Sequence, residues 1–112
     1  MQIPDLSALE KLGTKLRSEG KRIGWTNGCF DLIHPGHLST FRYLREQTDF
    51  VVVGLNADNS PYFSTKPGRP IHDQDFRALM LLGLRDIDAV YVYADENPIP
   101  SLLALKPDLC VK

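Results

Sequence analysis

Apolar residues recur with helical spacing in four parts of the chain and run together in short stretches between them. The first part predicts an amphipathic helix over residues 5–19, with apolar positions at Leu6, Leu9, Leu12 and Leu16. Ser7 and Glu10 have the spacing of a capping box at its start, and Gly20 stands where a glycine ends many helices. We expect its leucine face to pack on a sheet.

Short apolar stretches alternate with the helical segments. They predict strands over 23–26, 50–55, 89–93 and 109–111, and helices over 35–47, 74–85 and 97–105. The run from 50 to 55 is continuously apolar, which is typical of a strand buried on both faces of a parallel sheet. Asp73 can cap the third helix, which carries Phe76, Leu79, Met80 and Gly83 on one side. The alternation predicts an α/β fold with a single Rossmann-like open parallel sheet and helices on both faces.

Residues 57–73 show almost no periodicity and form a long polar loop. Pro61, Pro67 and Pro70 oppose a helix there, while Gly68 supplies a hinge. Lys66 and Arg69 add positive charge, and a loop of this length inside a small domain is usually functional. We expect residues 60–68 to be mobile and to close over an anion.

Composition restricts the class of protein. A chain of 112 residues with 43% hydrophobic and 24% charged residues is expected to fold as one globular domain. Its formal net charge of −1 provides no general attraction to nucleic acid or anionic lipid. The apolar runs are too short to span a bilayer, and Cys29 and Cys110 have no CxxC pairing, which favours free thiols. We expect a cytoplasmic protein with no membrane or nucleic-acid partner.

The richest polar cluster follows the strand predicted at 23–26, where open α/β sheets bind ligands. Gly28 would let the backbone turn tightly, and the free N–H groups of a helix starting at Pro35 attract anions. His34 and His37 are three residues apart, so both rings can face one side of that helix and donate hydrogen bonds. These residues together predict a phosphate site.

Other interpretations of this cluster have less support. The chain has neither the GxxxxGK[ST] pattern of a P-loop nor the GxGxxG pattern of a dinucleotide fold, which argues against an ATPase or a dehydrogenase. The histidines could bind a metal, but no third histidine or cysteine ligand accompanies them in the motif. They could also serve only as a helix cap and a surface residue.

The stretch Thr26–Asn27–Gly28–Cys29–Phe30–Asp31–Leu32–Ile33–His34–Pro35–Gly36–His37 resembles the signature of the cytidylyltransferase-like nucleotidyltransferases, with its HxGH motif. Further segments appear in the order seen in bacterial heptose-1-phosphate adenylyltransferases: Gly54–Leu55–Asn56–Ala57–Asp58, Gly68–Arg69–Pro70–Ile71, Arg77 and Pro107–Asp108–Leu109–Cys110–Val111–Lys112. The resemblance covers residues 5 to 112. It implies that residues 1–112 are a nucleotidyltransferase domain lacking the C-terminal segment of its relatives.

The resemblance also implies roles for particular residues. The catalytic residues would be His34, His37, Lys66 and Arg77, the last of these facing the loop and contacting phosphate. The nucleotide and its phosphates would be bound by Asn27, Gly28, Cys29, Phe30, Gly36 and Arg69, and the acceptor substrate by Asp31 and Asp58. No protein metal site is implied, and Mg²⁺ would arrive with the nucleoside triphosphate. Pro67 departs from the family, which usually has glycine after the lysine.

The implied reaction joins a nucleoside monophosphate from a triphosphate, ATP by resemblance, to a phosphorylated small-molecule acceptor such as heptose 1-phosphate, with release of pyrophosphate. This reaction belongs to ADP-heptose and lipopolysaccharide biosynthesis, and family members are commonly homodimers or larger. Three alternatives stay open: a cytidylyltransferase for glycerol phosphate, ethanolamine phosphate or a phosphonate; a catalytically degenerate nucleotide-binding protein; and a metal or redox module.

Overall fold

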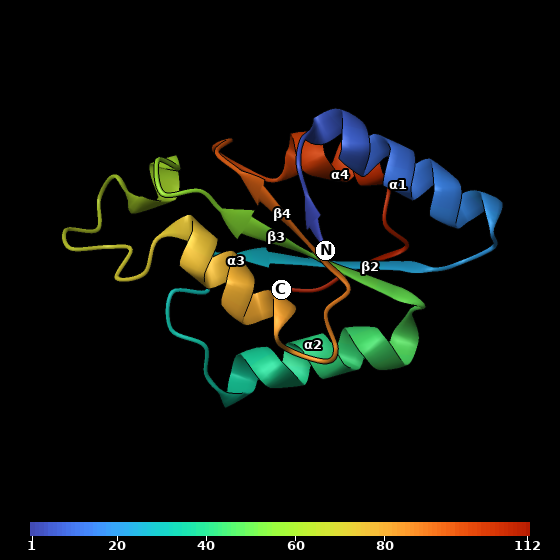
Figure 1. Cartoon of the computed structure of the whole chain (residues 1–112), viewed down its shortest axis with the longest axis horizontal. Coiled ribbons are helices and arrows are strands. Elements are labelled where there is room, and N and C mark those ends of the chain that lie inside the picture. The colour runs from blue at the N-terminus through green and yellow to red at the C-terminus, as the bar shows by residue number, and fades with distance from the viewer.

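A wholly parallel five-stranded sheet forms the centre of the computed structural model, which describes residues 1–112 (Figure 1). The strands lie in the order β1 (Gln2–Ile3), β4 (Ala89–Tyr93), β3 (Phe50–Asn56), β2 (Ile23–Gly28) and β5 (Leu109–Cys110). The helices are α1 (Leu6–Ser18), α2 (Pro35–Gln47), α3 (Gln74–Leu82) and α4 (Ile99–Leu105). The carboxyl ends of the parallel strands therefore meet at one edge, where ligands bind in such sheets.

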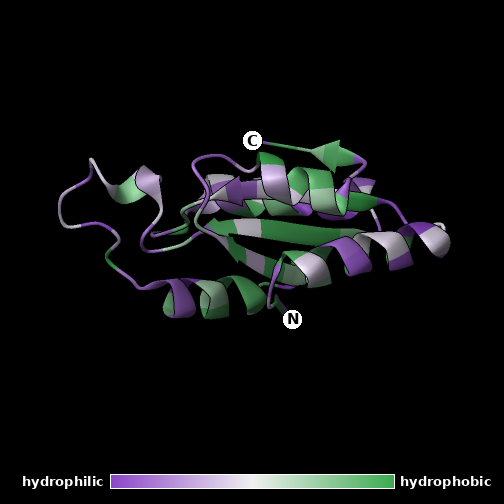
Figure 2. Ribbon diagram, turned by 90° about the horizontal axis from the view of Figure 1, so that it is seen from above, coloured by the Kyte–Doolittle hydropathy of each residue, from purple (hydrophilic) through white to green (hydrophobic).

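The helices cover both faces of the sheet, with α1 and α4 on one side and α2 and α3 on the other (Figure 1). Each face has its own apolar core. On the α1 side, leucines such as Leu9 and Leu105 pack around Trp25; on the other, Phe41 of α2 and Leu81 of α3 pack against β3. Figure 2 shows the hydrophobic strands enclosed between helices of mixed character. The predicted Rossmann-like α/β class is confirmed.

The start of the chain differs from the sequence prediction. Residues Gln2–Ile3 form the edge strand β1, paired in parallel with β4, although two residues are too few to show a period. The predicted capping box of Ser7 and Glu10 is wrong, because Asp5 is the N-cap and its Oδ1 accepts the Ala8 N–H at 2.8 Å. Asp5 stands directly before the first helical residue, and a side-chain acceptor at that position satisfies one of the free N–H groups.

Helix α3 ends at Leu82, earlier than predicted, and presents an unexpected face inward. Asp73 caps it as predicted, accepting the Phe76 N–H at 2.8 Å. The inward residues are Arg77, Ala78 and Leu81, whereas the apolar side predicted from Phe76, Leu79 and Met80 is exposed. The helix is therefore rotated so that an arginine lies on its buried face. Helix α4 begins at Ile99, two residues after the predicted start at Asn97. The Ile99 N–H donates to Asn97 Oδ1 at 3.0 Å.

Gly54 of β3 lies directly against Trp25 and Tyr93 in the core on the α1 side. A Cβ there would overlap Cζ2 and Cη2 of Trp25 and lie 3.1 Å from Cε1 of Tyr93. Overpacking of this kind typically costs about 1–3 kcal/mol. Gly54→Ala should therefore lower the free energy of unfolding by about that amount in denaturant titrations, and an unchanged midpoint would contradict the contact.

The loop between β3 and α3 contains one short helical turn, the 3-10 helix η1 (Pro61–Phe63), which the sequence did not indicate. Ser60 caps it by accepting the Tyr62 N–H at 3.3 Å. Proline is tolerated because it occupies the first position, where its missing N–H is not needed.

No helix in the structure has the length and apolar character required to cross a membrane.

Candidate active site

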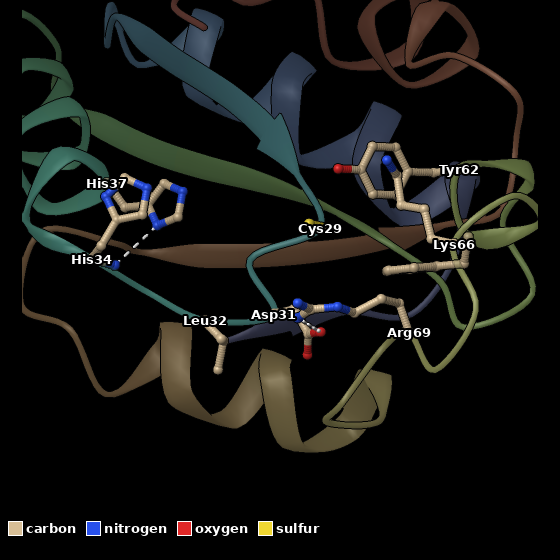
Figure 3. Close-up of a pocket in the computed structure, with 9 residues that line it drawn as sticks. Cys29, Asp31, Leu32, His34, His37, Tyr62, Lys66 and Arg69 are labelled. Carbon is tan, nitrogen blue, oxygen red and sulfur yellow. Dashed lines mark hydrogen bonds and ion pairs between the residues drawn. The ribbon is translucent and has the colours of Figure 1, made fainter.

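A cavity of about 390 Å³ opens at the carboxyl edge of the sheet, between the β2–α2 connection and the loop that follows β3 (Figure 3). Its lining joins residues from both segments: Cys29, Asp31, Leu32, His34, His37, Tyr62, Phe63, Lys66 and Arg69. Six of these carry roles implied by the sequence resemblance. Residues far apart along the chain are therefore gathered where the fold places ligands.

His34 and His37 cap helix α2 with their own rings. His34 Nδ1 accepts the Gly36 N–H at 3.1 Å, and His37 Nδ1 accepts the His34 N–H at 3.2 Å. The rings stack with centroids 3.7 Å apart. Because Nδ1 is the acceptor in both rings, each neutral imidazole carries its proton on Nε2. The cap thus leaves two Nε2–H donors available to a ligand at a helix N-terminus.

The surroundings of His37 favour its neutral form. Burial lowers the pKa of His37 below its ordinary value of 6.5, and the neighbouring His34 lowers it further.

Gly36 leaves space for the ring of His34, since a Cβ at that position would lie 2.9 Å from Cε1 of His34. The glycine of the motif does not line the large cavity itself; it permits the ring of His34 to fold back over the helix start.

The turn after β2 is made by Phe30 and not by the expected Gly28. Strand β2 continues through Gly28, while Phe30 has a φ of 43°, in the left-handed region that non-glycine residues rarely adopt. The Phe30 ring packs against His37 and Phe41, with centroids 5.1 Å and 5.4 Å away. The backbone N–H groups of Cys29 and Phe30 donate to no backbone carbonyl. They remain available for an anion.

Asp31 attaches the end of the 57–73 loop to the turn at Phe30. Its carboxylate accepts the backbone N–H groups of Ile71 at 2.8 Å and His72 at 2.9 Å, and pairs with Arg69 at 3.3 Å. Burial raises the pKa of Asp31, but the three donors outweigh burial and hold the pKa below its ordinary value of 3.8. Its implied contact with the acceptor stays a prediction, while its contact with the loop is a structural role that the sequence did not indicate.

This attachment has a testable pH dependence. A carboxylate whose pKa is depressed by folding stabilises the protein above its unfolded pKa and loses that contribution as the pH falls through the folded value. Asp31→Asn should cost on the order of 1–3 kcal/mol at pH 7, as for other hydrogen bonds to charged groups. Urea unfolding should show the gap between wild type and variant closing below pH 3.8. A gap independent of pH would contradict the ionised contact.

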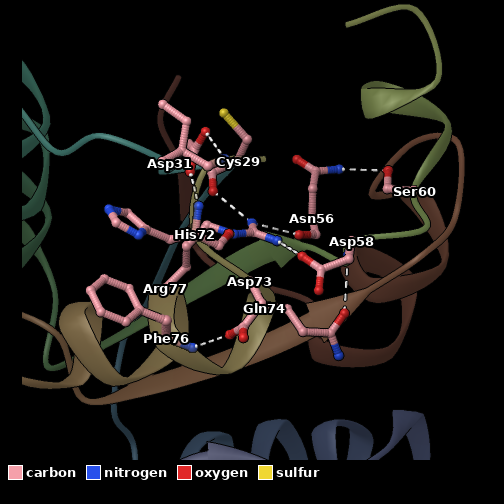
Figure 4. A network of polar contacts seen from close by, with 11 residues as sticks. Cys29, Asp31, Asn56, Asp58, Ser60, His72, Asp73, Gln74, Phe76 and Arg77 are labelled. Atoms are coloured by element: carbon pink, nitrogen blue, oxygen red, sulfur yellow. Dashed lines mark hydrogen bonds and ion pairs between the residues drawn. The ribbon is translucent and has the colours of Figure 1, made fainter. Parts of the chain in front are cut away.

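Arg77 is buried in the protein, and its guanidinium faces the two ends of the 57–73 loop. Its side chain is 1% exposed. Its Nη1 donates to the carbonyl oxygens of Cys29 and Asn56, both at 2.8 Å. Its Nε donates to the His72 carbonyl at 2.8 Å, and its Nη2 pairs with Asp58 at 2.7 Å (Figure 4). The guanidinium thus ties together the ends of β2, β3 and the loop. Its implied contact with phosphate stays untested.

Asp58 and its neighbours organise the start of the loop. Asp58 Oδ1 accepts a hydrogen bond from Arg77 Nη2, and the backbone N–H of Asp58 donates to Gln74 Oε1 at 3.0 Å (Figure 4). The Asp58 side chain is 41% exposed. Asn56 is buried at the end of β3, and its Nδ2 donates to Ser60 Oγ at 3.2 Å. The second carboxylate oxygen of Asp58 has no protein donor, so it can accept a hydrogen bond from a ligand.

Lys66 lies across the cavity from the histidines, on the loop (Figure 3). Its Nζ is 4.7 Å from the centre of the Tyr62 ring, within the range of a cation–π contact. The neighbouring Cys29 side chain raises the pKa of Tyr62 above its ordinary value of 10.0, so the hydroxyl stays protonated. Tyr62 therefore holds Lys66 beside the cavity wall that it shares with Cys29.

Not every residue with an implied role lines the main cavity. Asn27, Gly28 and Phe30 line an adjoining cavity of about 270 Å³ that shares Cys29, His37 and Tyr62 with the first. Sequence reasoning missed Tyr62 and Phe63. Two adjacent aromatic residues inside an otherwise polar loop were the signal that could have indicated them.

The donors in the cavity suit phosphate oxygens better than a resident metal. No group of three or more His, Cys, Asp or Glu side chains converges as metal ligands. Asp31, the carboxylate of the main cavity, is already occupied by three donors. Imidazole N–H groups, a lysine, an arginine and free backbone N–H groups instead form a candidate anion site.

A parallel α/β sheet with a candidate anion site at its carboxyl edge, built on a helix start, is typical of Rossmann-like nucleotide-binding domains. The chain belongs to the cytidylyltransferase-like family, which it matches over residues 25–112. The chain is accordingly a nucleotidyltransferase domain.

Curated relatives carry the name bifunctional protein HldE. The chain is 42% identical over 98% of its length to the protein from Mesorhizobium japonicum, and 46% identical over 88% of its length to that from Rhodospirillum rubrum. It spans 22% and 20% of those relatives, about a fifth of their length. A solved structure, the lipopolysaccharide core biosynthesis protein from Thermoplasma volcanium, has the same fold, with a TM-score of 0.72, 23% identity and coverage of 81% of this chain and 73% of that one.

Proposed function

We propose that this chain transfers a nucleotidyl group from ATP to a sugar phosphate such as heptose 1-phosphate and releases pyrophosphate. The observation that carries the proposal is the convergence of His34, His37, Lys66 and Arg69 on one cavity. Neutral N–H donors and two cations complement the oxygens of a triphosphate. The similarity to the HldE proteins, together with the heptose-type segments of the sequence, favours this nucleotide and acceptor.

The proposed step is an in-line displacement at the α-phosphorus. An oxygen of the acceptor phosphate forms the new P–O bond, the bond to the bridging oxygen breaks, and its electron pair leaves with pyrophosphate. A phosphate monoester has a second pKa near ~6, so its oxygen is already anionic at neutral pH and needs no protein base. Such a reaction depends on positioning and charge stabilisation. The cavity can supply both, although its carboxylate, Asp31, is already occupied by three donors and is not free to act as a base.

Each side chain has a proposed role in that step. The Nε2–H groups of His34 and His37 donate to non-bridging phosphate oxygens, and Lys66 and Arg69 offset the charge that moves onto pyrophosphate. Mg²⁺, held mainly by the oxygens of the triphosphate, neutralises part of the phosphate charge when bound. The free carboxylate oxygen of Asp58 can accept a hydrogen bond donated by a hydroxyl group of the acceptor substrate.

A substrate panel tests the proposal. ATP, CTP, GTP and UTP are each combined with heptose 1-phosphate, glycerol 3-phosphate and ethanolamine phosphate, and release of pyrophosphate is followed. We expect ATP with heptose 1-phosphate to react fastest and the release to require acceptor. Fastest release with CTP and glycerol 3-phosphate would support the cytidylyltransferase alternative instead. Nucleotide binding without release from any pair would point to the degenerate binder.

A further inference from the structure

We infer that Arg77 is a positioning residue: from inside the protein it fixes the left-handed turn at Phe30 that presents the free Phe30 N–H to the phosphates. The inference rests on the proposed function for its kinetic consequence. Its structural part concerns the free protein and can be tested without any substrate.

The turn at Phe30 is held from both sides. The Cys29 carbonyl, directly before it, accepts from Arg77 Nη1 at 2.8 Å. The Asp31 carboxylate, directly after it, accepts from Ile71 and His72. A left-handed conformation at a residue with a bulky side chain is strained and persists only where surrounding contacts impose it. These two attachments supply that constraint.

The direction of the Cys29 carbonyl decides where the next N–H points. In a trans peptide unit the C=O and the following N–H point in opposite directions. Since the Cys29 carbonyl is drawn inward to Arg77, the Phe30 N–H of the same unit points away from Arg77, and it has no backbone acceptor. The buried guanidinium therefore orients a free donor without itself leaving the interior.

Only arginine can make this set of contacts. Its Nε reaches the His72 carbonyl, its Nη1 reaches the carbonyls of Cys29 and Asn56, and its Nη2 reaches a carboxylate oxygen in the loop after β3. The guanidinium holds its donors in a rigid planar fork, whereas the lysine ammonium is a single point at the end of a flexible stem. A direct contact of Arg77 with phosphate would require it to leave these acceptors and its partner Asp58.

The test compares Arg77→Lys with Arg45→Lys. Arg45 is a matched control at the opposite, amino edge of the sheet, where it pairs with Asp88 and donates to the carbonyls of Asp49 and Asp86, each at 3.2 Å. Both variants keep the charge and lose the fork. Amide proton–nitrogen correlation spectra are recorded without ligand, followed by melting curves and steady-state kinetics.

We expect Arg77→Lys to move the free-state resonances of Cys29, Phe30 and Asp31 and to reduce turnover by about 10- to 100-fold, the effect of a small misplacement of reacting groups. Arg45→Lys should lower the melting temperature but leave those resonances and turnover unchanged. In wild type, the Arg77 Nε–H should stay protected from exchange when ATP and Mg²⁺ are added.

Two results would overturn the inference: unchanged free-state resonances at the turn in Arg77→Lys, or loss of Arg77 Nε–H protection when nucleotide binds. The second result would make Arg77 a direct phosphate ligand. If wild type releases no pyrophosphate but the turn moves in Arg77→Lys, the proposed function fails and the positioning role stands.

Discussion

Replacing either His34 or His37 by alanine should lower turnover by a factor of about 10²–10³, the effect of removing one preorganised donor from developing charge. Each ring offers one Nε2–H to the cavity because its Nδ1 accepts a backbone N–H of the helix start. Steady-state pyrophosphate release measures the effect. Near-normal turnover in both variants would remove the histidines from the phosphate site.

The two functions of His34 can be separated with a second variant. His34→Ala also removes the helix cap, which costs about 0.5–2 kcal/mol. His34→Asn retains a side-chain acceptor suited to an N-cap but cannot reproduce the Nε2–H donor. We expect the asparagine variant to recover most of the melting temperature and none of the turnover. Recovery of turnover as well would mean that the ring serves the helix and not the ligand.

Replacing Lys66 by alanine should reduce turnover by about 10²-fold while leaving the melting temperature nearly unchanged. Lys66 is exposed on the loop, and its described contact is with the face of the Tyr62 ring, so little packing is lost. Lys11, exposed on α1 across the sheet, provides the control, since Lys11→Ala should alter neither quantity. Equal kinetics for the two variants would return Lys66 to the ordinary surface charges.

The same loop should become ordered when the site fills. We expect residues 60–68 to gain protection from hydrogen exchange on addition of ATP and Mg²⁺, because the positive charges of the loop close over the triphosphate and exclude water. The attachment of Asp31 to Ile71 and His72 already fixes the far end of the loop. Unchanged exchange at saturating nucleotide would contradict closure.

The sequence predicted those elements whose hydrophobic spacing or capping residue depends only on neighbours in the chain. The continuous apolar run that became β3, the leucine spacing of α1 and the cap at Asp73 each depend on neighbours within a few residues. Strand β1 was not predictable, because two residues carry no period and the strand exists only through its pairing with β4. The rotation of α3 was missed for a related reason, since apolar periodicity gives no sign that an arginine will be buried.

In the candidate site too, the features set by neighbouring residues were predictable, and those set by contacts between distant segments were not. The three-residue spacing of His34 and His37 around Pro35 predicts a pair at a helix start, and the structure places both rings there. The inward direction of Arg77 and the left-handed turn at Phe30 depend on contacts between segments distant in the chain. Glycine was the natural expectation for that turn, but the surrounding contacts impose it on phenylalanine. The homo-oligomeric state and the cytoplasmic location stay predictions.

The central claim is tested most directly by following ATP radiolabelled at the α-phosphorus or, in parallel, at the γ-phosphorus, in the presence of Mg²⁺ and heptose 1-phosphate. Nucleotidyl transfer predicts that the α-label appears in the acceptor product and the γ-label in pyrophosphate, in equal amounts. Transfer of the γ-label to the acceptor, or release of either label as free phosphate without product, would contradict the account.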